Sequence, residues 1–349
     1  MTSSAPVGIG LPTHNGEPFI AQALESLLAQ EHGEIEIVVS DNASTDRTPD
    51  IVRDFMRRDS RIRLERSEQL VTAPQNFNRV FALSSGPLFM WAADDDLWDP
   101  AYVRRCVAAL AADPEAVMAS TRLRFIDPAG TVLDSDYGRY DNPDLSSRSA
   151  TRRIQILLRR GGFYQVYGLA RREALLRTGL FRDVHGPDVV LTFELAMLGP
   201  VLLVPEPLFF YRRFPERTEA TRVERQGGIQ DASRAVAERM TRLEEALSAA
   251  VGRSALSGPE KLRLRAEILR AAYVNDTPMR SRTRKEVAGR AASAWHERDP
   301  GGVVKYGLAW TIDRSQALPG MGRRSVARAR RLAGRARRRL AGPRTPDRS

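Results

Sequence analysis

The sequence predicts an α/β fold, with a mostly parallel sheet flanked by helices and a mainly helical carboxyl-terminal extension. Short apolar runs alternate with amphipathic stretches of about 10–15 residues over the first 112 positions, which is the pattern of βαβ units. Hydrophobic residues make up 42% of the 349, enough for a sizeable core. No apolar run approaches the roughly 18 residues that a membrane-spanning helix needs.

The alternating region begins with an apolar run at 7–12, which reads as a buried strand. Residues 18–30 carry apolar side chains at helical spacing, with Pro18 in the first turn. A strand at 34–40 follows, and Asp46 is expected to cap the next helix. The further expected elements are that helix to residue 57, a strand at 62–65, a helix at 74–83, a strand at 87–92 and a helix from Pro100 to residue 112.

After residue 116 the pattern becomes mixed, which indicates additions to the parallel core. The expected elements are strands within 116–134 around a turn at 127–130, a loop at 134–150, a helix at 152–160, a strand at 163–170, a helix at 188–198 and two short strands within 200–214. From about residue 218 onward the chain is expected to be mainly helical. The predicted division is therefore an α/β domain at 1–217, a helical region at 218–320 and a basic tail at 321–349.

The net charge of +11 is concentrated at one end of the chain. Eleven arginines and one aspartate give residues 321–349 a net charge of +10, so the remaining 320 residues carry only +1. A nucleic-acid interface on the folded body is therefore not expected. A single cysteine, Cys106, excludes an internal disulfide framework and a cysteine zinc cluster. With no signal-peptide pattern at the start, we expect a cytoplasmic protein.

Three polar groups follow expected strands, namely Thr13–Asn15, Asp41–Asn42 and Asp94–Asp96. In parallel sheets, ligands bind beyond the carboxyl ends of the strands, so these groups are expected to converge. The three adjacent aspartates repel one another and call for a counter-charge. A divalent metal carrying a diphosphate would supply it. The alternative is that Asp96 and Asp99 merely favour the start of the helix at Pro100.

Two common nucleotide motifs are missing. Gly8 and Gly10 lie inside the first expected strand, and Thr13 stands where G-x-G-x-x-G requires its third glycine. No G-x-x-x-x-G-K-[ST] sequence occurs. An NAD enzyme and a Walker-type nucleotide triphosphatase are therefore not expected.

The stretch VGIGLPTHNGEPFIAQALESLLAQEHGEIEIVVSDNASTDRTPDIV closely resembles the amino-terminal signature of family 2 glycosyltransferases, and ADDDLWDP resembles their acidic metal motif. The resemblance covers roughly residues 5–215 and implies a GT-A (Rossmann-like) catalytic domain in 1–217. It further implies inverting transfer of a sugar from a nucleotide diphosphate-sugar, with Mg²⁺ or Mn²⁺ as cofactor. Many relatives carry aspartate where this chain has Ala93, which leaves the metal ligand open among the three aspartates.

By this resemblance, Asp41 would accept a hydrogen bond from the base, and Asp95 is the first candidate for direct metal coordination, with Asp96 beside it. The residues expected to bind the nucleotide-sugar are Pro12, Thr13, Asn15, Asp41, Asn42, Asp94 and Arg212. Arg212 and its neighbour Arg213 follow a strand and have the planar geometry that clamps a diphosphate. An incidental pair of surface arginines is the alternative.

Inverting transfer also needs a base for the acceptor hydroxyl. Relatives place this carboxylate at a helix start, and Asp188 fits, since the positive end of a helix favours an ionised carboxylate. A plain helix cap is the alternative role. Glu194, about two turns further on, is a weaker candidate, and His185 is a candidate for contact with a phosphate or the acceptor.

The remaining expectations concern partners. The Q-x-x-R-W motif of processive synthases is missing, so we expect transfer of one sugar to a saccharide or lipid-linked saccharide, in cell-surface polysaccharide or glycolipid synthesis. Residues 218–320 would bind the acceptor or form a homodimer. The basic tail suits an anionic membrane surface, at the inner face, or is simply solvated. Two alternative functions are a sugar-phosphate nucleotidyltransferase, which usually has a glycine-rich loop after the first strand, and an inactive binding or membrane scaffold protein.

Overall fold

The computed structural model describes residues 5–133, 142–160, 163–184, 186–214 and 232–274. The chain divides into two compact units, Met1–Arg265 and Ala266–Ser349. No helix in the described ranges is both long and apolar enough to cross a bilayer.

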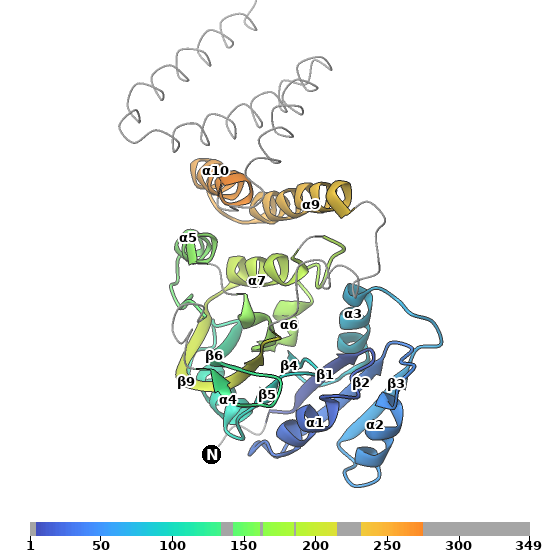
Figure 1. The fold of residues 1–349 in the computed structure, drawn as a ribbon. Coiled ribbons are helices and arrows are strands. Elements are labelled where there is room, and N and C mark those ends of the chain that lie inside the picture. The colour runs from blue at the N-terminus through green and yellow to red at the C-terminus, as the bar shows by residue number, and fades with distance from the viewer. Residues whose placement is uncertain (1–4, 134–141, 161–162, 185, 215–231, 275–349) are drawn as a thin grey trace, which may run out of the picture. The chain divides into compact units, whose positions relative to one another are not determined.

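The alternating elements predicted from the sequence are present (Figure 1). They are β1 (Val7–Thr13), α1 (Ile20–Leu28), β2 (Ile35–Asp41), α2 (Thr48–Met56), β3 (Ile62–Arg66), α3 (Ala73–Leu83), β4 (Leu88–Trp91) and α4 (Tyr102–Ala112). The short strand β5 (Leu97–Trp98), between β4 and α4, was not predicted. The structure starts α2 at Thr48 rather than directly after Asp46. The N-cap position is Arg47, one residue after Asp46. Asp46 Oδ1 nevertheless accepts the backbone N–H of Thr48, the first residue of the helix, at 3.0 Å.

The second half adds mixed elements. They are β6 (Met118–Ile126), β7 (Val132–Leu133), α5 (Ala150–Arg160), the 3₁₀ helix η2 (Tyr164–Tyr167), β8 (Leu169–Arg171), α6 (Arg172–Leu175), α7 (Pro187–Leu198), β9 (Val201–Arg212), α9 (Ala232–Arg253) and α10 (Gly258–Val274).

Two expectations for this half were wrong. The apolar stretch 163–170 forms a 3₁₀ turn before a short strand, not one strand. The stretch 200–214 holds the single strand β9, not two, because register shifts against β6 at Thr121–Leu123 absorb its prolines, one of which, Pro207, pairs with Arg122.

Nine strands of the described chain form one sheet in the order β3-β2-β1-β4-β8-β6-β9-β5, with β7 paired to β6. Strands β1 to β4 run parallel to one another. Strand β8 is antiparallel to both β4 and β6, and β9 is parallel to β6. It follows that β6 and β9 run in the same direction as β1 and β4. The carboxyl ends of β1, β4, β6 and β9 therefore lie at the same edge of the sheet, whereas β8 runs the opposite way.

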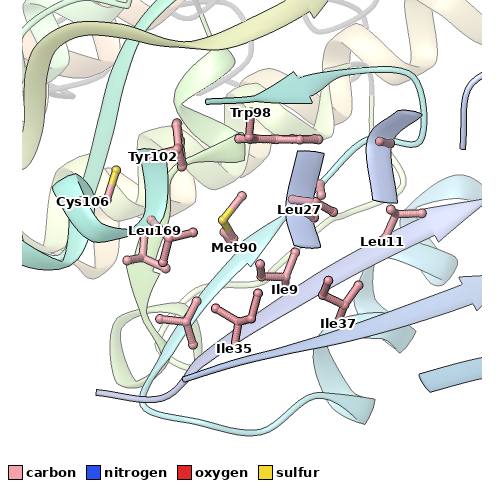
Figure 2. Packing of buried hydrophobic residues seen from close by; sticks show 14 of the residues in the cluster. Ile9, Leu11, Leu27, Ile35, Ile37, Met90, Trp98, Tyr102, Cys106 and Leu169 are labelled. Atoms are coloured by element: carbon pink, nitrogen blue, oxygen red, sulfur yellow. The ribbon is translucent and has the colours of Figure 1, made fainter. Parts of the chain in front are cut away.

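The main core lies on the sheet face that receives Ile9 and Leu11 from β1 and Ile37 from β2 (Figure 2). Helices α1, α2 and α4 contribute to the same cluster, through residues such as Leu27 and Cys106. Every position of β1 is buried, which explains its continuous apolar run. Burial raises the pKa of the Cys106 thiol to about 12, so this cysteine is a packing residue.

The opposite face explains the two glycines of β1. A Cβ at Gly10 would lie 2.7 Å from the Phe89 ring and 2.8 Å from Val80 of α3. A Cβ at Gly8 would lie 2.6 Å from the Ser85 carbonyl oxygen. These glycines admit close packing of α3 and β4 against the strand, which agrees with the absence of a dinucleotide motif.

Candidate active site

The end of β1 meets the acidic segment after β4. The Thr13 hydroxyl donates to Asp94 Oδ2 at 2.5 Å, although 81 residues separate them in the chain. A Cβ at Gly16 would come within 2.6 Å of both Asp94 Oδ2 and Thr13 Oγ1. The glycine in the PTHNG turn is therefore required for this contact, and Thr13 and Asp94 share one edge of the sheet as predicted.

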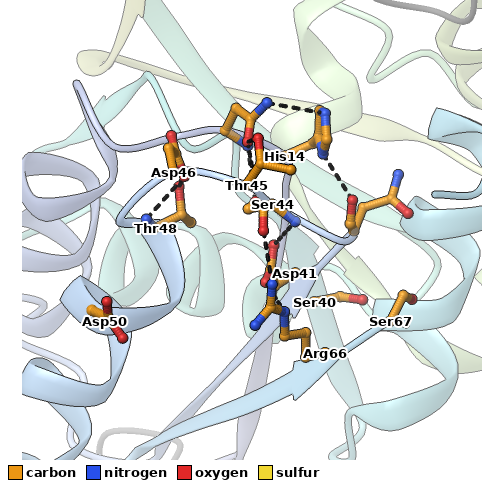
Figure 3. A network of polar contacts seen from close by, with 12 residues as sticks. His14, Ser40, Asp41, Ser44, Thr45, Asp46, Thr48, Asp50, Arg66 and Ser67 are labelled. Carbon is orange, nitrogen blue, oxygen red and sulfur yellow. Dashed lines mark hydrogen bonds and ion pairs between the residues drawn. The ribbon is translucent and has the colours of Figure 1, made fainter. Parts of the chain in front are cut away.

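The end of β2 holds a buried carboxylate (Figure 3). Asp41 is 0% exposed, and its Oδ1 accepts the Ser44 backbone N–H at 3.0 Å. Arg66 at the end of β3 places Nε 3.1 Å from Asp41 Oδ2 and donates through Nη2 to the Ser44 carbonyl at 2.8 Å. Sequence reasoning missed Arg66. The available signal was its position at the end of the strand that pairs with β2, directly opposite Asp41.

The remaining residues of the turns are fixed by local contacts. Asn15, in the left-handed region with φ 53°, accepts the Thr45 backbone N–H at 2.9 Å. The Asn42 side chain binds both the N–H and the carbonyl of Val71, each at 2.9 Å. Pro12 is buried within β1. Asn42 is therefore committed to holding the loop before α3, and its contribution to a ligand site is indirect.

The three aspartates have different environments. Asp94 and Asp95 are half-buried, whereas Asp96 is only 1% exposed. Asp96 Oδ1 accepts the Arg212 backbone N–H at 2.7 Å, and within the described chain its buried Oδ2 has no hydrogen-bond partner. Burial, together with the negative charge of Asp95 and Asp94, raises the pKa of Asp96 well above its usual range.

Arg212 lies beneath this segment and is 2% exposed. It donates through Nε to the Asp95 carbonyl at 2.6 Å, through Nη1 to the Pro128 carbonyl at 2.7 Å and through Nη2 to Gln22 Oε1 at 2.9 Å. Its guanidinium carbon is also 4.9 Å from the centre of the Phe19 ring. Because these donors are directed at protein groups, the placement favours a role in positioning the acidic loop over direct contact with a diphosphate.

The residues present fit a divalent cation. Three carboxylates follow one another, and one of them keeps a buried oxygen without a donor, which is costly unless a cation or a donor approaches. No group of three or more His, Cys, Asp or Glu side chains in the described ranges forms a complete metal site. Mg²⁺ and Mn²⁺ in nucleotide sites are typically held by one or two carboxylates, with substrate phosphates and water as the other ligands.

Asp188 occupies the first turn of α7, after Gly186 in the left-handed conformation with φ 65°. The helix η2 packs against α7 and against β4, the strand that leads into the aspartates. Burial, followed by the charges of Asp96, Tyr211, Asp95 and Asp188, raises the pKa of Tyr167 in η2. Asp188 and the acidic segment thus act on the same phenol. His185 lies outside the described residues.

Glu194, the weaker candidate base, is engaged elsewhere. Its side chain is 5% exposed, and Oε1 pairs with Arg182 at 2.7 Å and with Arg253 of α9 at 2.8 Å. Its Oε2 accepts the Gly179 backbone N–H at 2.7 Å. Glu194 therefore fastens α9 and the loop that leads to Asp188 onto α7.

We expect Glu194→Ala to lower the free energy of unfolding by about 2–3 kcal/mol, measured by urea denaturation. Loss of one partner of a fully buried pair typically costs about 3–5 kcal/mol. The cost is smaller here because Arg253 is 59% exposed and gains solvation when the carboxylate is removed. Glu25→Ala, at an exposed position of α1, is the matched control and should change stability by less than about 0.5 kcal/mol. Equal stabilities of the two variants would contradict the fastening role.

Comparison with known proteins agrees with this architecture. Residues 9–184 match the sequence profile of Glycosyl transferase family 2. An uncharacterized glycosyltransferase of Nostoc sp. is 27% identical over 217 residues, covering 59% of this chain and 64% of that protein. TuaG of Bacillus subtilis, named as a glycosyltransferase of teichuronic acid biosynthesis, is 29% identical over 99 residues, covering 28% and 39%. The chain thus spans less than two thirds of the length of these relatives.

The fold is also similar to that of S. aureus TarS residues 1–349, solved in complex with UDP-GlcNAc, with a TM-score of 0.61. The superposition covers 89% of this chain and 91% of that one, at 14% identity. This likeness extends the agreement in fold beyond the segment matched by the profile. On the family match over residues 9–184, which is half of its length, the chain is a member of glycosyl transferase family 2.

Proposed function

We propose that this glycosyltransferase is an inverting, metal-dependent and non-processive enzyme that moves one sugar from a nucleotide diphosphate-sugar to an acceptor hydroxyl. The observation that carries the proposal is the 2.5 Å hydrogen bond between Thr13 and Asp94, which joins the turn after β1 to the acidic segment. The nucleoside side of a donor and its diphosphate side would meet at this contact. Buried Asp41 lies at the end of the neighbouring strand.

The donor would lie across the ends of β1, β2 and β4. Asp41, held by Arg66 and Ser44, would accept a hydrogen bond from the base, and Pro12, Thr13 and Asn15 would form the wall of the nucleoside site. A uracil imide, with one donor between two acceptors, suits this carboxylate. The UDP-GlcNAc bound by TarS supports a uridine donor as the first choice to test.

Asp95, with Asp94 or the orphaned oxygen of Asp96, would hold Mg²⁺ or Mn²⁺. The cation would neutralise negative charge as it develops on the departing diphosphate. Arg212 would keep the loop in place, since it binds the Asp95 carbonyl through its side chain and the Asp96 carboxylate through its backbone. An anchored loop allows the carboxylates to meet the donor without reorganisation.

Asp188 would act as the general base. It would take the proton from the acceptor hydroxyl as the acceptor oxygen bonds to the anomeric carbon and the bond from that carbon to the diphosphate breaks. Its place in the first turn of α7 favours the ionised form, which is the form that can accept a proton. One displacement from the opposite face inverts the configuration of the sugar.

The proposed pathway and acceptor are supported by one of the relatives. TuaG supports a role in cell-surface polysaccharide synthesis, with a saccharide or lipid-linked saccharide as acceptor. We place the reaction in the cytoplasm, at the inner face of the membrane. The acceptor or dimer role of 218–320 remains a proposal, and the basic tail at 321–349, proposed to contact the membrane, lies outside the described residues.

The test incubates the protein with UDP-, dTDP- and GDP-sugars, with Mn²⁺ or with a chelator, and measures release of the nucleoside diphosphate. One donor should be consumed, and only in the presence of the metal. NMR of the transferred sugar should then give an anomeric configuration opposite to that of the donor. A retained configuration would contradict the inverting mechanism, and release that is insensitive to the chelator would contradict the metal.

A further inference from the structure

The segment 178–184, which joins α6 to α7, is held by an asparagine from a distant helix. Asn78 of α3 donates through Nδ2 to the Phe181 carbonyl at 2.8 Å, and its Oδ1 accepts the Phe181 backbone N–H at 3.0 Å. The two residues are 103 positions apart in the chain. A primary amide is suited to this arrangement, because it can donate to a backbone carbonyl and accept from a backbone N–H at the same time. We call this double contact the Asn78 link.

The side chain of the same phenylalanine contacts the strand that leads to the acidic segment. Phe181 is 7% exposed, and its ring centre lies 5.0 Å from that of Trp91 in β4 and 4.5 Å from that of Phe77 in α3. Trp91 is fully buried, donates through Nε1 to the Phe77 carbonyl at 2.9 Å and stands three residues before Asp94. The backbone and the side chain of Phe181 therefore fix the segment 178–184 against the part of the fold that carries the aspartates.

The segment 178–184 is also fastened to the helix that carries Asp188. Glu194 of α7 accepts the Gly179 backbone N–H and pairs with Arg182, as described above. Between these two contacts, Leu180 has a φ of 50°, a left-handed conformation that is unfavourable for leucine and persists only where the surroundings fix it. The segment is therefore held from two sides, by α3 and β4 on one and by α7 on the other.

The proposed reaction needs these two sides at a fixed separation. The diphosphate would lie at the acidic segment and the base on α7, and both must act on the same anomeric carbon. A displacement of about 1 Å, caused by a change far from the chemistry, can lower a rate about 100-fold. We propose that Asn78 is a positioning residue, which acts through the Phe181 backbone to place Asp188 relative to the acidic segment. This inference rests on the proposed function and adds to it a residue that acts on the reaction only through the base.

The experiment uses the full chain, Mn²⁺ and the donor selected by the nucleotide-release assay, with a panel of octyl glycosides as acceptors and water as the acceptor in their absence. Asn78→Ala should lower kcat by about 10–100-fold, because Asp188 is no longer held in place. The donor KM and the donor-induced rise in Tm should stay within about twofold of the wild type. In the Asp188→Asn background, the same change should lower kcat by less than about twofold, because a residue that acts through the base has no effect once the base is absent.

The matched control is Arg61→Ala, which removes another side-chain contact to a distant backbone carbonyl. Arg61 donates through Nη2 to the Leu28 carbonyl at 3.1 Å, and it precedes β3, at the amino-terminal edge of the sheet. This variant should lower Tm by an amount similar to Asn78→Ala and leave kcat unchanged. A second variant, Phe181→Leu, keeps the Asn78 link but removes the ring that contacts Trp91. It should lower kcat in the same way, with no further loss in the Asp188→Asn background, and it decides the question if Asn78→Ala does not fold.

An unchanged kcat in folded Asn78→Ala would overturn the inference. So would a loss of kcat that is as large in the Asp188→Asn background as in the wild type, because Asn78 would then act independently of the base. Failure of the proposed function looks different. In that case the wild type shows no metal-dependent release of nucleoside diphosphate, or Asp188→Asn alone keeps the kcat of the wild type, and the inference falls with it.

Discussion

Asp188→Asn should lower the rate of sugar transfer by about 10²–10⁴-fold, which is the contribution typical of a positioned general base. Asparagine has nearly the same shape as aspartate, but it cannot accept the proton of the acceptor hydroxyl. Donor binding should persist, so the rise in Tm caused by nucleoside diphosphate and Mn²⁺ should match that of the wild type. The measurement is kcat for nucleoside diphosphate release with a saccharide acceptor.

The matched control is Asp50→Asn, since Asp50 also lies in the first turn of a helix, α2, and is 69% exposed. Both substitutions remove a negative charge from a helix amino terminus and should cost about 0.3–1 kcal/mol of stability. Only the change at Asp188 should affect kcat. Transfer within fivefold of the wild type in Asp188→Asn would assign the base to another group and leave Asp188 only a favourable charge in the first turn of α7, whose cap position is Gly186.

Asp95→Ala should lower transfer by more than about 100-fold and remove the response to Mn²⁺. Loss of a group that merely supports a metal ligand typically costs about 10–100-fold, and loss of the ligand itself should cost more. Asp95 is half-buried, and its backbone carbonyl, which Arg212 holds, is unaffected by the substitution. The variant should therefore fold with a Tm close to that of the wild type.

Comparison of Asp95→Ala with Asp96→Ala distinguishes a metal ligand from a residue that supports the acidic segment. Asp96→Ala should lower Tm even without nucleotide, because the buried Arg212 N–H loses its acceptor. Asp54→Ala, at a partly exposed position of α2, should change neither property. Full transfer activity with an unchanged Mn²⁺ requirement in Asp95→Ala would move the ligand to Asp94 or Asp96.

The parallel half of the fold was predictable because each of its elements has a local signal. The continuous apolar run of β1 and the helical spacing in α1 follow from burial on both faces and on one face, respectively. The 163–170 segment misled the prediction. A short run rich in aromatic residues reads as a strand, but the structure packs it as a 3₁₀ turn between α7 and β4.

The candidate site was predictable in part for a similar reason. Polar residues after parallel strands must meet at one edge, so the sequence predicts that Thr13–Asn15 and Asp94–Asp96 converge, and the structure joins Thr13 to Asp94. The ion pairs and hydrogen bonds of Arg66 and Arg212, in contrast, join residues that are far apart in the sequence. Arg66 pairs with Asp41 across the sheet, and Arg212 reaches α1, the acidic loop and the 127–128 turn at once. Spacing in the chain contains no signal for such contacts.

Two alternative functions, a sugar-phosphate nucleotidyltransferase and an inactive scaffold protein, can be compared with these findings. Membership of the glycosyltransferase family argues against a sugar-phosphate nucleotidyltransferase. In the place of a glycine-rich phosphate loop, the turn after β1 holds Asn15, bonded to Thr45 of the next turn. An inactive scaffold would have no use for the orphaned carboxylate oxygen of Asp96. The activity assays above decide this point.

The most direct test of the central claim is a thermal-shift panel of UDP, dTDP, GDP and CDP, each with and without Mn²⁺. One nucleotide should stabilise the protein only when the metal is present, by about 2.7 kcal/mol at a hundredfold excess over its Kd. The stabilisation should vanish in Asp95→Ala and persist in Asp188→Asn. Flat curves across the whole panel, on folded protein, would contradict a metal-dependent nucleotide-sugar site at the carboxyl edge of this sheet.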